Sequence, residues 1–86
     1  MPKVSEFFGI SIYFYYREHE PPHFHAIYAE HEMLLAIETL EPIRGALPRR
    51  AHSLVIEWAI AHRAELRNAW ELGRQMQPLP WIEPLT

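Results

Sequence analysis

The stretch HFHAIYAEHEMLLAIETL, residues 23–40, decides the fold, because two runs of alternating side chains flank a short polar connection. The alternation predicts two strands, His23–Ala29 and Met33 to about Leu40, since successive side chains point to opposite faces of a sheet. If the connection over residues 29–32 is an even-numbered loop, one shared face carries Phe24, Ala26, Tyr28, Met33, Leu35 and Ile37. We expect that face to form the core. The other face then carries His23, His25 and Ile27 opposite Leu34, Ala36 and Glu38, and an odd loop would exchange the faces of one strand.

The residues before this stretch predict a further hairpin. Ile10–Arg17 alternates and is rich in β-branched and aromatic residues, which favours a strand. A shorter extended segment, Lys3–Phe8, precedes Gly9 and is expected to pair with it. Pro21 and Pro22 then end the run, because neither has an N–H to donate to a neighbouring strand.

The spacing of the apolar residues changes after the predicted sheet. Residues 42–48 form a link that contains Gly45, and from Pro48 onward apolar residues return at helical spacing. One helix over residues 48–76 would be ~43 Å long. Because strands usually span only ~17–20 Å, we expect part of this helix to project or to pack on another copy. The tail, residues 77–86, holds three prolines and is expected to be extended, with its apolar side chains covering the same domain or a partner.

These segments together predict a single α+β domain. Its parts are a small antiparallel β-sheet of about four strands in residues 1–41, one long C-terminal α-helix over residues 48–76, and an extended proline-rich tail over residues 77–86. A chain of 86 residues buries roughly 60% of the surface that its unfolded form would expose, so the domain can fold alone.

Composition excludes several classes of protein. Apolar residues make up 49% of the chain and charged residues 22%, as in ordinary globular domains. No apolar run approaches the ~20 residues of a membrane span, and the first residues lack the features of a signal peptide, so we expect a cytoplasmic protein with no membrane partner. The absence of cysteine excludes disulfides, thiolate metal sites and cysteine nucleophiles, so any metal would need histidine and carboxylate ligands.

Charge is unevenly distributed along the chain. The formal net charge is −3, with a balance of −4 over residues 1–48 and +2 over residues 49–77. Five arginines lie in the predicted helix: Arg49, Arg50, Arg63, Arg67 and Arg74. They form a solvated face or contact phosphate. The acidic first half weighs against nucleic acid as a partner, because an anionic surface repels phosphate.

The segment EHEPPHFHA, residues 18–26, is the best candidate site. His23 and His25 are two apart on a predicted strand, so both imidazoles point to one side and can converge on one ion. A third ligand would come from the preceding turn or the neighbouring strand: His19, Glu18, Glu20 or Glu38. Three such ligands would hold a divalent metal such as zinc, manganese or nickel and leave a position open for catalysis.

Two readings of the same segment need no metal. In the first, His23 or His25 acts as a general acid or base, with Arg17 and Tyr15 as the candidate supporting groups. In the second, the two prolines stiffen a hairpin and the histidines line a half-exposed face. His62 falls on the apolar helix stripe, where a hydrogen-bonded packing histidine is expected.

Several motifs of the chain resemble one family. They are the start M-P-x-V-S-E-F-F-G-I, the H-x-P-P-H-x-H signature of residues 19–25, the L-P-R-R-A segment of residues 47–51, and the tryptophan-bearing helix. Together they are similar to small bacterial proteins grouped as domain of unknown function 4160. The resemblance implies a curled antiparallel sheet with one long helix, and a gene beside a second small protein, as in a toxin–antitoxin pair. It also implies that five positions of the signature recur in the family: His19, Pro21, Pro22, His23 and His25.

Two hypotheses of function follow. The favoured one is a protein-interaction module that docks its helix and tail onto another copy or onto a companion small protein, and that forms one half of a toxin–antitoxin-like pair. The alternative is a small metal- or histidine-dependent hydrolase or nuclease-like toxin, with His19, His23 and His25 at its centre and the helix arginines holding phosphate.

Overall fold

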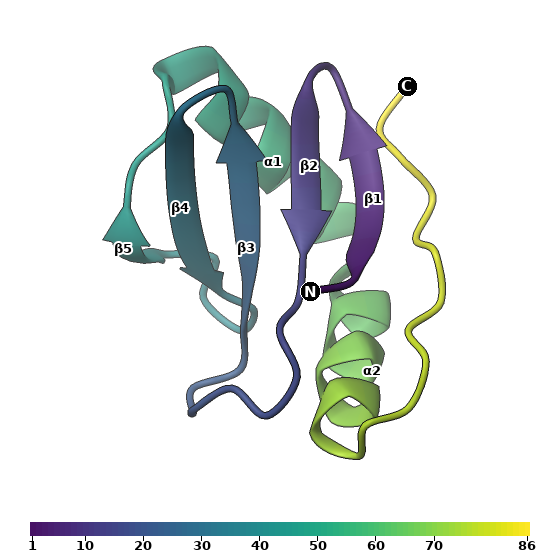
Figure 1. Cartoon of the computed structure of the whole chain (residues 1–86). Coiled ribbons are helices and arrows are strands. Elements are labelled where there is room, and N and C mark those ends of the chain that lie inside the picture. Colours follow the sequence, from purple (N-terminus) through teal and green to yellow (C-terminus); the bar gives the residue numbers. More distant parts are fainter.

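The computed structural model, which describes all 86 residues, is an α+β domain built on a five-stranded antiparallel sheet. The strands, which lie side by side in chain order, are β1 (Lys3–Phe7), β2 (Ile10–Tyr13), β3 (His23–Tyr28), β4 (His31–Ala36) and β5 (Pro42–Gly45). Helix α1 lies behind the sheet, and α2 continues past the sheet end from which the β2–β3 loop emerges (Figure 1).

The hairpin of β3 and β4 places its side chains on the predicted faces, although β4 spans His31–Ala36 and not Met33 to about Leu40. Its loop is the even-numbered pair Ala29–Glu30, so Phe24 lies opposite Leu35 and Ala26 opposite Met33. All four of these side chains are fully buried, which confirms the predicted core face. His23 and His25 lie on the other face, as expected, but they are buried, with only 6% and 3% of their surface exposed, and not half-exposed.

The first hairpin also forms, although β2 is shorter than predicted. It ends at Tyr13 and not at Arg17. Phe14 remains buried, and its N–H donates to Pro2 O at 3.1 Å. Arg17 then adopts a left-handed conformation with φ 59°, which directs the chain away from the sheet and into a loop that returns to β3.

A fifth strand occupies the segment predicted to be a link, so the expectation of about four strands was wrong. Residues of β5 pair with β4, with Met33 opposite Gly45. A Cβ atom on Gly45 would lie 2.1 Å from Glu32 O, closer than atoms can approach. Gly45 is therefore a residue of β5 at which the backbones of two strands come close together, and not a residue of a loop.

The predicted single helix over residues 48–76 is two helices, α1 (Arg49–Ala61) and α2 (Arg63–Arg74). The break is at His62, which has φ −122° and donates its N–H to Ala59 O. The next residue, Arg63, donates through Nε to Ile37 O at 3.1 Å, which ties the start of α2 to the end of β4. Neither helix is long and apolar enough to cross a membrane.

The break changes what α2 can pack against. Its apolar side chains, Leu66, Ala69 and Trp70, are buried within the same chain. The expectation of one long helix that outruns the sheet was therefore wrong, because the turn at His62 returns the second half of the helix to its own domain.

The tail packs on its own domain. It runs beside β1 in Figure 1. Ile82 is buried and its N–H donates to Val4 O at 2.7 Å, while Trp58 of α1 donates through Nε1 to Glu83 O at 2.8 Å. The three prolines keep the tail extended, as predicted, and these contacts fasten it across β1 and α1.

Candidate metal centre

The loop between β2 and β3 brings Glu18 to the two strand histidines. His23 and His25 point to the same side of β3, with ring centroids 5.3 Å apart. One carboxylate oxygen of Glu18 and one ring nitrogen of each histidine all lie within 4.8 Å of one another. The predicted pair of histidines thus converges with a carboxylate from the preceding turn.

Both imidazoles present the same nitrogen to the same oxygen. Glu18 Oε1 lies 2.5 Å from His25 Nε2 and 3.2 Å from His23 Nε2. Glu18 is partly exposed, at 22% of its side chain, whereas both histidines are buried. The carboxylate is therefore the side of the cluster that faces solvent.

The other ring nitrogen of each histidine is already occupied. His23 Nδ1 lies 2.8 Å from Pro21 O, and because a carbonyl oxygen only accepts, this nitrogen must carry the proton. His25 Nδ1 lies 3.0 Å from Glu32 Oε2 and donates to that carboxylate. A carbonyl or carboxylate that accepts from the distal nitrogen is the arrangement that orients metal-binding histidines.

These bonds leave a lone pair on each Nε2 when the ring is neutral. Two lone pairs and the Glu18 carboxylate would then converge on one another, which is repulsive. A positive charge placed among the three atoms would relieve that repulsion.

Aromatic rings line the cluster. Tyr15 stacks on His25 with centroids 4.2 Å apart, and Trp70 of α2 lies 5.2 Å from His23. Burial, followed by the nearby charges of Glu32 and Glu18, raises the pKa of Tyr15, so its hydroxyl stays protonated at neutral pH. The rings exclude water from two sides of the histidines.

Glu18 remains charged in spite of its surroundings. Burial alone would raise its pKa, but hydrogen bonds from His25 and His23 favour the carboxylate, and the pKa of Glu18 is lowered below its ordinary value. An ionised carboxylate is the form that binds a metal.

Other predicted site residues lie outside the cluster. His19, Glu20 and Arg17 are exposed, and Glu20 faces Arg74 at 3.8 Å. Glu38 accepts two hydrogen bonds from Arg67, each 2.7 Å long, and these bonds lower its pKa. The structure thus brings together His23, His25 and Glu18 among the predicted residues, and it engages Glu38 elsewhere.

Glu32 is the contact that sequence reasoning missed. It lies on the same face as His25, one diagonal step away, because His25 pairs with Leu34 and side chains alternate along β4. The sequence predicts Glu32 in the connection between the strands, whereas it is the second residue of β4. His62 packs on the Trp58 ring and bonds Glu65, as a packing histidine was expected to do.

Most of the helix arginines are engaged within the chain. Arg63 binds a backbone carbonyl, Arg67 binds Glu38, and Arg74 contacts Glu71 and Glu20. Arg49 and Arg50 remain without an ion pair. The arginines therefore do not form one free basic face for phosphate.

Comparison with known proteins identifies the family. Residues 9–71 match the model of the domain of unknown function (DUF4160), so the chain belongs to this family, as its motifs predicted. No curated protein and no solved structure matches the chain.

Proposed function

We propose that this member of the DUF4160 family binds one divalent metal ion through Glu18, His23 and His25 and uses it for hydrolysis. One observation carries the proposal. Both histidines place Nδ1 against a fixed acceptor and aim Nε2 at one carboxylate oxygen, so three ligand atoms converge on one place that could hold a cation.

The spacing of these atoms suits a small ion. Zinc binds histidine nitrogens at ≈ 2.0–2.1 Å in tetrahedral sites, so its ligand atoms lie about 3.3 Å apart. The separation of Glu18 Oε1 from His23 Nε2, 3.2 Å, already matches this value. His25 Nε2 would move from Glu18 Oε1 by less than about 1 Å to accommodate an ion between them.

The donor set points to catalysis and not to a structural role. Structural zinc sites close all four positions with protein ligands, whereas two histidines and one carboxylate leave a position for water. A bound ion would supply an activated water at neutral pH. Glu18 lies on the solvent side of the cluster, while Tyr15 and Trp70 line its inner side, so a substrate would approach past the carboxylate.

Metal content of the untagged protein, purified without chelator, tests the binding. We expect near-stoichiometric zinc, manganese or nickel in the parent and none in the H23Q/H25Q variant. The matched control is H62Q, which removes a histidine that also bonds a glutamate, and it should keep the metal. Metal-free parent protein that takes up none of the three ions on dialysis would refute the proposal.

Hydrolysis is tested separately with chromogenic ester and phosphodiester substrates. The metal-loaded parent should release nitrophenolate from at least one of them, and the H25Q variant should not. A metal-loaded parent that is inactive on every ester and phosphodiester tested would leave the ion site in place and remove the catalytic role.

A protein-interaction module is the second candidate, and one observation favours it. Strand β5 lies at an edge of the sheet with all four of its residues exposed, among them Ile43, and such an edge can pair with another strand. Trp81 of the tail is also exposed. A homo-oligomer, or a complex with a companion small protein as in a toxin–antitoxin-like pair, would cover these residues. Light scattering across a range of concentrations, with I43K as the variant, tests self-association.

A further inference from the structure

A second feature lies at the opposite end of β3 from the histidines. A cavity of about 150 Å³ opens between the β1–β2 turn, the end of β3 and the first turns of α1. Its walls are mainly apolar and include Phe8, Ile10, Tyr28, Ala51 and Leu54. The cavity is open to solvent on one side, and its volume is that of an interior cavity that accepts benzene. None of its lining residues belongs to the histidine cluster.

Phe8 is held over this cavity at a cost to the fold. It occupies the first position of a two-residue turn with φ 51°, followed by Gly9 with φ 79°. Asparagine and glycine suit this turn, whereas a bulky residue is disfavoured at positive φ. The Phe8 side chain is nevertheless 57% exposed, so the domain gains little by burying it. A ligand that covers the ring would account for both observations.

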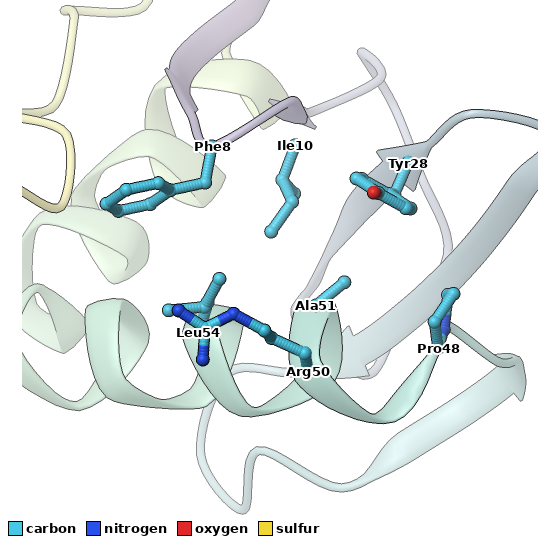
Figure 2. Close-up of a pocket in the computed structure, with 7 residues that line it drawn as sticks. All are labelled: Phe8, Ile10, Tyr28, Pro48, Arg50, Ala51 and Leu54. Atoms are coloured by element: carbon cyan, nitrogen blue, oxygen red, sulfur yellow. The ribbon is translucent and has the colours of Figure 1, made fainter.

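Tyr28 forms the wall across from Phe8. Figure 2 shows the two rings on either side of Ile10, above the side chains of α1. A Cβ atom on Gly9 would lie 3.3 Å from the Tyr28 ring, so the glycine allows this ring to lie close beside the turn. The cavity is therefore flanked by two aromatic rings with an aliphatic side chain between them.

The polar side of the cavity is positive. Arg50 lines it and forms neither an ion pair nor a hydrogen bond, in contrast to Arg63, Arg67 and Arg74. Helix α1 begins beside it with no side-chain cap and no acidic residue in its first turn. No carboxylate lines the cavity. A free guanidinium beside an uncompensated helix start favours an anionic group on the ligand.

We propose that this cavity binds a small aromatic carboxylate, with the ring between Phe8 and Tyr28 and the carboxylate at Arg50. The size of the cavity limits the ligand to one ring, the two aromatic walls favour a planar group, and the unpaired arginine selects a negative charge. The site is separate from the histidine cluster and does not depend on a metal.

Benzoate is the probe, followed by amide chemical shifts in ¹⁵N-labelled protein. We expect saturable shifts at Gly9, Tyr28 and Ala51 with a dissociation constant of about 1 mM, the range for so small a ligand. Benzyl alcohol, which keeps the ring without the charge, should bind about tenfold more weakly. Acetate, which keeps the charge without the ring, should give no saturable shifts at these residues.

Neighbouring arginines provide the matched variants. R50Q should weaken benzoate binding about tenfold, whereas R49Q, one residue away and outside the cavity, should bind as the parent does. F8N suits the turn and should keep the fold while weakening binding. Absence of saturable shifts with benzoate would overturn the proposal, as would equal affinity for benzyl alcohol together with unchanged binding by R50Q.

Discussion

Two contacts between a histidine and a glutamate have the same length in this protein and very different surroundings. His25 Nε2 lies 2.5 Å from Glu18, and His62 Nδ1 lies 2.5 Å from Glu65. The His25 side chain is 4% exposed and that of His62 is 19% exposed. A second histidine reaches the first carboxylate, and none reaches the second.

The two contacts differ in how many separate elements supply their residues, and not in the distance between the histidine and the glutamate. Glu65 follows His62 by three residues on one helix, where side chains meet by local geometry alone. Glu18, His25 and Glu32 come from a loop and two strands, and tertiary structure must hold all three. A contact that three separate elements maintain in a buried place has the features of a site. Three of the four predictions below use the His62 pair as the reference, and the fourth compares a Glu18 variant with the parent.

The largest expected effect is stabilisation by zinc. At a free concentration one hundred times the dissociation constant, zinc should stabilise the parent by ≈ 2.7 kcal/mol. For a domain of this size that raises the melting temperature by roughly 10–20 °C. The H25Q variant should gain nothing, and H62Q should gain as much as the parent. Calorimetry measures the increase in melting temperature. Equal increases in H25Q and H62Q would show that zinc does not bind through His25.

Removal of each imidazole from the metal-free protein comes next. H25A removes a buried imidazole that contacts Glu18, Glu32 and the Tyr15 ring, and it should cost about 2–3 kcal/mol of unfolding free energy. H62A removes a more exposed contact and should cost less than about 1 kcal/mol. Urea denaturation of both variants in the presence of chelator measures the two values, and the order should not reverse.

The outer carboxylates allow a finer test. Glu32 orients His25 through Nδ1, so E32Q should weaken zinc binding by about 10–100-fold. E65Q, the corresponding change at His62, should leave zinc affinity unaltered. Calorimetric titration of both proteins gives the comparison, and an E32Q protein with parental affinity would show that the contact does not orient a ligand.

The smallest expected effect is on the stability of the fold at low pH. Because the folded protein lowers the pKa of Glu18 below its ordinary value of 4.5, the charged carboxylate stabilises the fold above that pH. This stabilisation should be lost as the pH falls through the lowered value. The groups that face Glu18 are His23, His25 and Tyr15, with Glu32 beyond His25. Metal-free E18Q should therefore lose less stability than the parent between pH 6 and pH 3 in urea denaturation, and parallel curves would contradict the assignment.

Local patterns predicted the hairpin that carries the histidines. Alternation and an even loop placed Phe24 and Met33 in the core and both histidines on the other face, because the two-residue period of a strand is a local property. The place of Glu32 beside His25 did not follow, because Glu32 was expected in the connection and instead lies within β4.

The helical segment shows the opposite case. Its apolar spacing continues through His62, and no proline or glycine marks the break. The break depends on contacts distant in sequence, including the bond from Arg63 to Ile37 O. The fifth strand likewise depends on the close approach of Gly45 to Glu32 O, a contact that residues 42–48 do not reveal by themselves.

The sequence by itself determined the α+β class, the core face of the central hairpin and the common direction of His23 and His25, because all three follow from the period of side chains along a strand or helix. Only the tertiary structure decided that Glu18, and not Glu20 or Glu38, joins the histidines. Three acidic residues lay within reach along the chain, and the path of the loop after Arg17 brought one of them to the imidazoles while Arg74 and Arg67 paired with the other two.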